Sequence, residues 1–274
     1  METISNAHGL NLPKLGLGTW PMLDAECTRA VLSALELGYR HIDTAAAYNN
    51  EAAVGEALST TDVPREHIHV TTKVWWDKLE PAALQASFED SLKALRTDYV
   101  DLFLIHWPGR GDWNLQASLD ALTALYESGR AKAIGVANFP LALMRQAVEE
   151  LKAPLAALQV EYHVALDQQP LLDFCRQHQI ALTAYSPLAR NRLSDYQALQ
   201  QIAHKHGVLP TQVALKWLLD QEGVAAIPKA ASINNQRSNL EAFKVRLDDE
   251  DRALIAQLPK DQRLVSPDFA PKWD

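Results

Sequence analysis

The chain has 274 residues, of which 47% are hydrophobic, and a net charge of −8 from 26 basic and 34 acidic side chains. This length suits one large domain, and the dispersed acidic balance argues against nucleic acid or an anionic membrane surface as the main partner. Two cysteines are too few for a disulfide framework. The sequence lacks an apolar run of membrane-spanning length and a secretory leader pattern, so we expect a cytoplasmic protein.

The chain opens on a predicted hairpin within residues 1–14, where Asn6-Ala7-His8-Gly9 forms the turn. Short apolar segments then alternate with segments of helical periodicity. The predicted strands cover residues 15–20, 39–45, 68–74, 99–106, 131–138, 155–161, 180–186 and 224–228. The predicted helices cover residues 26–37, 51–59, 84–95, 115–128, 141–151, 170–178, 196–206, 211–221, 235–243 and 249–258.

Eight strand–helix repeats without a linker predict one α/β domain over residues 1–274, a (β/α)8 TIM barrel with a short N-terminal hairpin and two additional helices. Strands such as Asp101-Leu102-Phe103-Leu104-Ile105 are almost continuously apolar, as expected when both faces are buried. The alternative is an open, doubly wound sheet. It is disfavoured because eight strands close a barrel and because Gly16-Leu17-Gly18 lacks the third glycine of a dinucleotide fingerprint.

Polar side chains stand at the predicted carboxyl ends of the strands, where barrel enzymes place their chemistry. These residues are Asp43, Lys73, His106, Asn138, Glu161, Tyr185 and Lys229. Such residues often meet solvent or cap the next helix, and a loop tyrosine such as Tyr48 often only packs its ring. Asp43, Lys73 and His106 nevertheless fall on three adjacent strands. A nearby ammonium would lower the pKa of Tyr48 and make it a usable general acid or base.

Two histidine pairs invite other interpretations. His67-Ile68-His69 resembles a metal-binding pair of hydrolytic barrels, but it falls at the start of a strand, on the end associated with stability. We therefore expect no metal site there, and a metal-dependent hydrolase is disfavoured. His204-Lys205-His206 ends a predicted helix, where cations suit the helix dipole, and we expect a solvated helix end.

Four segments together resemble the aldo-keto reductase family over essentially the whole chain. They are Gly38-Tyr39-Arg40-His41-Ile42-Asp43-Thr44-Ala45 followed by Tyr48, Leu104-Ile105-His106-Trp107-Pro108, Gly135-Val136-Ala137-Asn138-Phe139 and Ile227-Pro228-Lys229. The resemblance implies a TIM barrel that binds NADPH in an extended form. It also implies a catalytic tetrad of Asp43, Tyr48, Lys73 and His106. In this family Tyr48 would protonate the carbonyl oxygen, Lys73 with Asp43 would tune it, and His106 would orient the carbonyl.

The same resemblance implies the binding residues. Asn138 and Gln159 match the nicotinamide-carboxamide binders, Tyr185 the aromatic that stacks on the nicotinamide, and Lys229 the residue on the 2′-phosphate. The full set for the cofactor is Gly18, Thr19, Trp20, Asp43, Asn138, Gln159, Tyr185, Ser186, Pro187, Leu188, Lys229, Ser232, Arg237 and Asn239. The set for the substrate is Trp20, Tyr48, Trp75, His106 and Trp107.

Three positions depart from the family pattern. Ala137 replaces a serine beside the carboxamide, Ala189 replaces a glycine after the Ser-Pro-Leu loop, and Asn235 replaces the phosphate-binding arginine, with Arg237 two residues on. An arginine binds phosphate bidentately, so its displacement leaves NADH as an open alternative to NADPH.

The C-terminal segment, with Arg263-Leu264-Val265-Ser266-Pro267 and Ala270-Pro271-Lys272-Trp273-Asp274, is similar to the bacterial 2,5-diketo-D-gluconate reductase subgroup. This similarity implies small carbonyl substrates such as methylglyoxal, simple aldehydes or diketo acids. It also implies an open pocket with Trp273 at its edge. We expect a monomer that reduces such a substrate. The alternative is an NADPH-binding sensor or interaction protein with little turnover.

Overall fold

The protein is described by a computed structural model that covers residues 2–274, with the side chain of residue 194 excepted. Within this range, eight parallel strands follow one another around a sheet in chain order. They are β3 (Leu17–Gly18), β4 (His41–Asp43), β5 (His69–Val74), β6 (Leu102–Ile105), β7 (Ile134–Ala137), β8 (Ala157–Glu161), β9 (Ala181–Tyr185) and β10 (Val224–Ala226). Parallel bridges from Leu15 to Ala226 and from Gly18 to Lys229 close the sheet, which confirms the predicted TIM barrel.

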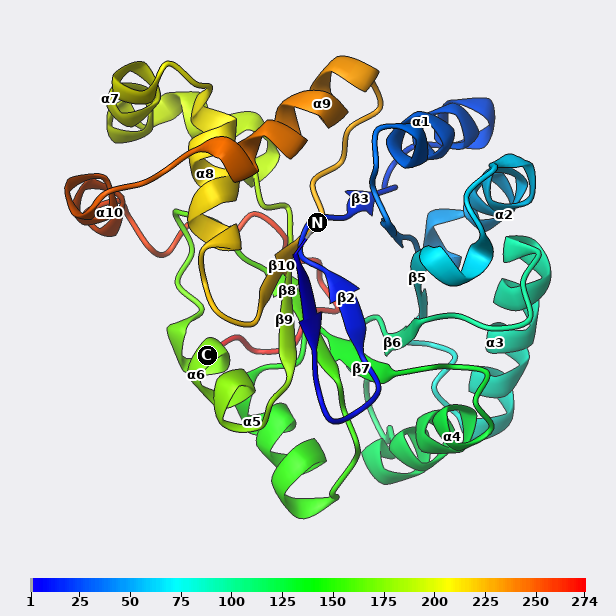
Figure 1. Cartoon of the computed structure of the whole chain (residues 1–274). Coiled ribbons are helices and arrows are strands. Elements are labelled where there is room, and N and C mark those ends of the chain that lie inside the picture. The colour runs from blue at the N-terminus through cyan, green and yellow to red at the C-terminus, as the bar shows by residue number, and fades with distance from the viewer. Residues whose placement is uncertain (1) are drawn as a thin grey trace.

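The helices surround the strands (Figure 1). They are α1 (Asp24–Glu36), α2 (Glu51–Thr60), α3 (Pro81–Leu95), α4 (Leu115–Glu127), α5 (Leu141–Arg145), α6 (Gln169–Gln177), α7 (Gln197–His206), α8 (Pro210–Leu219), α9 (Ile233–Glu241) and α10 (Asp249–Ala256). Two helices lie between β9 and β10 and two follow β10, so the expected additional pair is present among the described residues. The sequence predicted one helix over residues 141–151, but the backbone widens into a π-helix at Gln146–Glu150.

Local sequence explains where individual helices begin and which face they bury. Pro81 occupies the first turn of α3, and the Glu80 side chain accepts hydrogen bonds from two backbone N–H groups of that turn. Leu84, Phe88 and Leu92 then repeat at helical spacing on the buried face. This pattern fixes the helix against the outer surface of the barrel.

The N-terminal hairpin, β1 (Thr3–Ser5) and β2 (Asn11–Pro13), lies across one end of the barrel, in front of the strands in Figure 1. Leu10 and Leu12 are buried in one apolar cluster with Leu102 and Leu104 of β6, together with small alanines from several other strands. The hairpin therefore covers the amino end of the barrel, and the opposite end is left for binding. The red C-terminal segment passes behind the strands in this view.

The hydrogen-bonded strands are shorter than their apolar sequence segments. Residues 39–45 and 99–106 were predicted as strands, whereas β4 and β6 cover only the middle of each segment. Tyr39, for example, is fully buried but its hydroxyl donates to the Gln236 carbonyl of α9, outside the strand ladder. Burial therefore extends beyond the ladder, because helices and loops also cover the ends of the strands.

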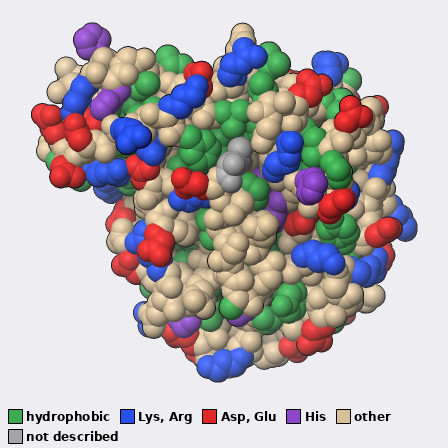
Figure 2. Space-filling model, viewed as in Figure 1, with side chains coloured by type: hydrophobic (Ala, Val, Ile, Leu, Met, Phe, Trp, Pro, Cys, Tyr) green, Lys and Arg blue, Asp and Glu red, His purple; other side chains and the backbone are tan. Residues whose placement is uncertain are grey.

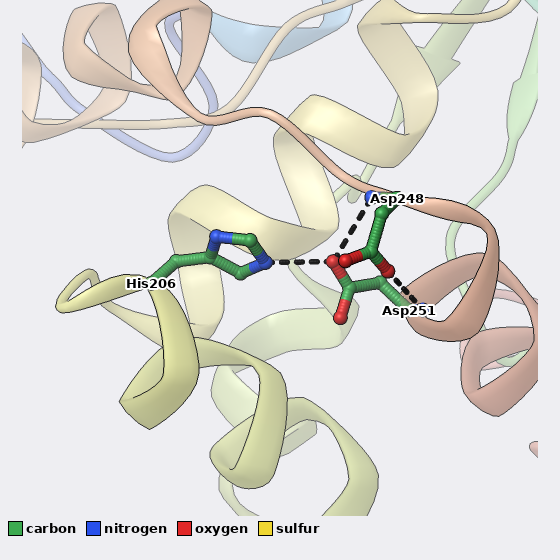
Figure 3. Close-up of side chains that lie close together, drawn as sticks. All are labelled: His206, Asp248 and Asp251. Carbon is green, nitrogen blue, oxygen red and sulfur yellow. Dashed lines mark hydrogen bonds and ion pairs between the residues drawn. The ribbon is translucent and has the colours of Figure 1, made fainter.

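The end of α7 is joined to α10 by a charged cluster (Figure 3). Asp251 is buried and accepts from Lys205 Nζ at 2.9 Å and from His206 Nε2 at 2.6 Å, and Asp248 accepts from Lys205 Nζ at 2.7 Å. The Lys205 side chain is exposed, as expected for a solvated helix end, but Lys205 and His206 also donate to a buried carboxylate, which requires donors. His204 is exposed.

His206, Asp248 and Asp251 could in principle ligate a metal ion, since their ligand atoms lie within 4.8 Å of one another. However, both oxygen atoms of Asp251 and both of Asp248 already accept hydrogen bonds, and the Lys205 ammonium supplies the positive charge. We therefore interpret the cluster as a connection between α7 and α10.

The visible face is mixed in charge. Figure 2 shows acidic and basic side chains interspersed over the end that carries the hairpin, with a dense group of both signs over α7 and α10. Among the described residues, every helix is too short or too polar to cross a lipid bilayer.

Candidate active site

Asp43, Tyr48, Lys73 and His106 meet at the carboxyl end of the barrel. Asp43 ends β4, Lys73 lies one residue before the end of β5, and His106 directly follows β6. Tyr48 lies in the 3-10 turn Ala46–Tyr48 that follows β4. Lys73 Nζ donates to Asp43 Oδ1 at 2.6 Å and lies 3.4 Å from the Tyr48 hydroxyl oxygen. The Tyr48 and His106 rings pack edge to face with centroids 5.4 Å apart.

Burial sets the protonation of this group. The Asp43–Lys73 ion pair is almost fully buried. Burial raises the pKa of Tyr48, and the Asp43 carboxylate adds to this effect. Burial lowers the pKa of His106, as does the Lys73 ammonium. Burial also lowers the pKa of Lys73, while Asp43 opposes it. Near neutral pH the site therefore holds a protonated phenol and a neutral imidazole.

The expectation that an ammonium would lower the pKa of Tyr48 is wrong for this structure. Desolvation of the hydroxyl is the largest cause of its shift and acts in the opposite direction. A phenol that keeps its proton can still act as an acid. The Lys73 ammonium, at 3.4 Å, would stabilise the phenolate once the proton has left.

Two side-chain amides form the next layer. Gln159 Nε2 donates to Asp43 Oδ2 at 2.7 Å, so that carboxylate is satisfied on both oxygens. Asn138 Nδ2 donates to the His106 carbonyl at 2.9 Å, and the Tyr185 hydroxyl donates to Asn138 Oδ1 at 2.8 Å. Asn138 adopts the left-handed backbone conformation with φ of 62°, which asparagine tolerates better than most residues. These bonds fix the tetrad and the amides as one network.

A cavity of about 680 Å³ opens on this network, which is within the usual range for a ligand site. Most of the predicted site residues line it. They are Gly18, Thr19, Trp20, Asp43, Tyr48, Trp75, His106, Trp107, Asn138, Gln159, Tyr185, Ser186, Pro187, Leu188 and Lys229. The structure thus brings the predicted chemical, amide, loop and phosphate-binding positions to one cavity. Lys73 lies behind Tyr48, fully buried.

Three predicted cofactor residues do not line this cavity. The Ser232 hydroxyl caps α9 by accepting from the Asn235 N–H. Arg237 lines a separate surface hollow of about 400 Å³ with Glu241 and others. Asn239 is buried on α9. The sequence pattern placed all three near Lys229, but helical periodicity turns their side chains in different directions.

Sequence reasoning missed several residues of the cavity wall. Phe269 packs against the rings of Trp75, Trp76 and Trp107 at centroid distances of 5.3 to 5.6 Å. Leu264, Val265, Ser266, Pro267, Arg190 and Asn191 also line the cavity. Trp273, expected at the pocket edge, lies against Trp107 with centroids 6.0 Å apart. Phe269 could have been identified from the sequence, because it is an aromatic residue between the two C-terminal stretches that resemble the reductase subgroup.

The loop after β9 has an unusual backbone. Ser186, Ala189, Arg190 and Asn191 all have positive φ between 46° and 67°, a conformation that costs free energy for residues other than glycine. The Arg190 guanidinium lies 5.5 Å from the centre of the Trp20 ring, and both residues line the cavity. Such strain is concentrated at functional sites, and Ser186, Arg190 and Asn191 line the cavity.

The cavity residues fit a nicotinamide dinucleotide. Two amides, Asn138 and Gln159, could pair with a carboxamide, and Tyr185 contributes an aromatic ring to the same cavity. The exposed Lys229 ammonium and the Arg190 guanidinium offer charge for phosphates. The buried Nδ1 atom of His106 has no hydrogen-bond partner among the described residues. The donor set is therefore suited to a polar, anionic and partly aromatic ligand next to the tetrad.

His67 and His69 do not face a common site. His67 is exposed in a short 3-10 turn, whereas His69 is buried in β5 and lies 3.0 Å from the Asn11 carbonyl of the hairpin. Their positions at the amino end of the barrel also separate them from the cavity.

Comparisons with known proteins agree with the geometry. A model described as "Aldo/keto reductase family" matches residues 14–260. The methylglyoxal reductase DkgB of Salmonella typhi is 41% identical over 97% of this chain and all of its own length. The glyoxal reductase of Bacillus subtilis is 38% identical over 96% of this chain and 95% of its own. A crystal structure provisionally assigned as a 2,5-diketo-D-gluconic acid reductase B is 39% identical, with a TM-score of 0.95 over 100% of this chain and 98% of that one. The chain therefore belongs to the aldo-keto reductase family and is an oxidoreductase.

Proposed function

We propose that the protein reduces small aldehydes and ketones to alcohols with NADPH, and that Tyr48 is the general acid. The observation that carries this proposal is the contact of the partly buried Tyr48 with the buried Lys73–Asp43 ion pair beside a cavity of suitable size. NADPH, when bound, supplies the hydride to the carbonyl carbon. The protein's residues hold the carbonyl and supply the proton to its oxygen.

Each member of the tetrad has a separate task in this proposal. His106 is a neutral imidazole that hydrogen-bonds and orients the carbonyl oxygen. Tyr48 gives its proton to that oxygen as negative charge develops on it. Lys73 stabilises the resulting phenolate, and Asp43 keeps Lys73 charged and aimed. The aromatic side chains Trp75 and Phe269 exclude water from the reacting atoms.

The cofactor end of the cavity supports NADPH over NADH. Lys229 is exposed at the cavity and is the cation that the family resemblance assigns to the 2′-phosphate. Arg190 is a further cation on the same cavity. These charges would favour the extra phosphate of NADPH, although Arg237 lies in a different hollow.

The substrate is proposed to be small. Relatives bear the names methylglyoxal reductase and glyoxal reductase, and the carbonyl end of the cavity is bounded by three aromatic rings, Trp75, Trp107 and Phe269. We infer methylglyoxal or a diketo acid such as 2,5-diketo-D-gluconate as candidates. The buried free thiols of Cys27 and Cys175 suit the reducing cytoplasm as the site of action. We also infer that the protein acts as a monomer.

The proposal is tested by following cofactor oxidation with methylglyoxal, nitrobenzaldehyde and a diketo acid. We expect turnover with NADPH and weaker turnover with NADH. Lys229→Ala should weaken NADPH binding about tenfold, equivalent to about 1.4 kcal/mol, and change NADH binding less. Lys244→Ala, which alters a lysine with a 79% exposed side chain outside the cavity, is the matched control.

The possible outcomes separate the alternatives. Cofactor binding without oxidation of the cofactor by any carbonyl would contradict the reductase proposal and favour a sensor. Equal losses of NADPH and NADH affinity in Lys229→Ala would place the 2′-phosphate away from Lys229.

A further inference from the structure

Glu161 is a buried acid at the rim of the barrel that the proposed mechanism does not use. It ends β8, and its side chain is 0% exposed. Removing a carboxylate from water is costly unless donors surround it. Where these donors come from therefore indicates what the residue holds in place.

Two of the donors belong to the backbone of the C-terminal segment. The Leu264 N–H donates to Glu161 Oε1 at 2.8 Å, and the Val265 N–H donates to Glu161 Oε2 at 2.9 Å. Hydrogen bonds to a charged acceptor are about twice as strong as neutral ones. One carboxylate thus accepts hydrogen bonds from two consecutive backbone N–H groups that are about one hundred residues away in sequence.

A third donor fixes the carboxylate itself. His163 Nε2 lies 3.1 Å from Glu161 Oε1, and the Ala165 N–H donates to His163 Nδ1 at 3.3 Å. Because Nδ1 accepts a hydrogen bond, the hydrogen of the neutral ring is on Nε2 and points at Glu161. His163 is fully buried as well. We define this buried Glu161–His163 pair as the anchor of the C-terminal segment.

The C-terminal segment that Glu161 holds forms one wall of the cavity. We define residues 260–274 as the C-terminal strap; apart from an isolated bridge at Asp261, it carries no helix or strand within the described residues. Its residues Leu264, Val265, Ser266, Pro267 and Phe269 line the cavity that Tyr48 and His106 share. At its far end, Asp274 Oδ2 accepts from the Leu141 N–H of α5 at 2.7 Å. The start of the strap is also attached, because the Gln262 N–H donates to the Ala165 carbonyl at 2.9 Å and the Asp167 N–H to the Lys260 carbonyl at 2.8 Å. Beyond Gln262, the bonds to Glu161 are the first that hold the cavity-lining part of the strap.

Contacts connect the anchor to the reacting groups. Phe269 packs against Trp75 with centroids 5.3 Å apart, and Trp75 packs against His106 with centroids 5.0 Å apart. Movement of the strap at Leu264 and Val265 would therefore shift the ring that bounds the substrate. The cofactor end, at Lys229, follows β10 and is bridged to Gly18 at the end of β3.

We propose that Glu161 is a positioning residue whose buried carboxylate holds the C-terminal strap at Leu264 and Val265, and so sets the substrate half of the cavity for small carbonyl compounds. This inference rests on the proposed function. Glu161 touches neither the reacting atoms nor the tetrad; it acts through the strap. Its loss should change substrate discrimination more than hydride transfer itself.

The test compares Glu161→Gln with Glu149→Gln in the full-length protein. Glu149 also contacts a histidine, His178, at 3.3 Å, but it is partly exposed and outside the cavity, so it controls for loss of a Glu–His contact. In Glu161→Gln an NH2 group, which donates hydrogen bonds, replaces one carboxylate oxygen that accepts them. We expect KM for methylglyoxal to rise about tenfold, with kcat within about threefold and KM for nitrobenzaldehyde changed less. Glu149→Gln should leave all three near the wild-type values.

A double-mutant cycle with Phe269→Ala tests whether the effect passes through the strap. If Glu161 acts by placing Phe269, the double variant should lose less discrimination than the sum of the two single variants. Additive effects, or an equal fall in kcat for both substrates, would overturn the proposal. So would a change in NADPH affinity as large as the change in KM.

Hydrogen exchange in the unmodified protein provides a measurement that does not depend on the folding of a variant. The amides of Leu264 and Val265 should exchange more slowly than the strap amides for which the structure shows no hydrogen bond. Rapid exchange at both would overturn the anchor. If the protein proves inactive on carbonyls while these amides are protected, the proposed function fails and the anchor stands, so the two failures are distinguishable.

Discussion

Strands β4 and β5 each carry a buried titratable residue near both ends, and the two ends behave differently. At the amino end, His41 and His69 lie edge to face with ring centroids 4.9 Å apart, beneath the hairpin carbonyls of Pro13 and Asn11. At the carboxyl end, Asp43 and Lys73 form an ion pair that adjoins the cavity. The two pairs are separated by only a few residues along the same strands.

The comparison shows how a charged partner changes the pKa of a buried titratable group. Burial lowers the pKa of His41 and of His69 to about 3, so both rings are neutral over the physiological range. Lys73 is buried to the same degree, but Asp43 opposes the loss of its charge. The amino end thus keeps neutral groups that serve stability. The carboxyl end keeps a charge pair that can respond to a proton leaving Tyr48.

The largest expected effect comes from removing the phenolic proton. Tyr48→Phe should lower turnover about 10²–10⁴-fold, which is the usual contribution of a positioned acid, while NADPH binding is retained. Turnover and cofactor affinity are measured on the same preparation. Tyr126→Phe, which alters a tyrosine of α4 outside the cavity, is the control. Full turnover in Tyr48→Phe would remove this residue from the mechanism.

The next effect breaks the ion pair. Lys73→Met leaves Asp43 buried without its cation and should lower the free energy of unfolding by about 3–5 kcal/mol. Turnover should fall as well, because the phenolate loses its partner. The double variant Asp43→Asn/Lys73→Met should recover part of the stability but none of the turnover. Urea unfolding measures the stability, and the reductase assay measures the turnover. Recovery of both in the double variant would mean that the ion pair is only structural.

The smallest expected effect on turnover concerns the amino end, where pH acts on stability alone. Between pH 6.5 and about 3 the unfolded chain protonates His41 and His69 but the folded chain does not, so stability falls as pH falls through this window. Each histidine contributes a slope of about 1.4 kcal/mol per pH unit. His69→Asn should halve their joint contribution, measured by urea unfolding from pH 7 to pH 4, without changing activity per folded molecule. His178→Asn, at a partly exposed histidine, should leave the slope unchanged; an unchanged slope in His69→Asn would contradict the assignment.

Much of the fold could be predicted because its elements carry strong patterns. The eight apolar segments and the helical spacing of residues such as Leu84 and Phe88 indicated a closed barrel, and the rule that chemistry lies at the carboxyl ends selected Asp43, Lys73 and His106. The resemblance to a family then indicated a role for Tyr48. These inferences depend on local sequence and on one topological rule.

Other features depend on contacts between distant segments and were not predictable. Glu161 was recognised only as a strand-end acid, because its partners at Leu264 and Val265 have no pattern of their own. The family resemblance grouped Ser232 and Arg237 with Lys229, whereas in the structure Ser232 caps α9 and Arg237 lines a separate hollow. The ion pairs of Lys205 and His206 were missed for the same reason, since the buried Asp251 is contributed by α10.

The connection between α7 and α10 has a further consequence, which is entropic. Because α10 is held by Lys205 and His206, the chain enters the C-terminal strap from a fixed point, and Asp274 fixes its other end on α5. Backbone bonds at Lys260 and Gln262 and the Glu161 carboxylate at Leu264 and Val265 attach the interval at further points. Each attachment shortens the free loop that remains, and the entropy of a loop changes by about 0.6 kcal/mol for each doubling of its length. An irregular stretch of chain can in this way present a defined surface to a substrate, with its conformational freedom removed before the substrate arrives.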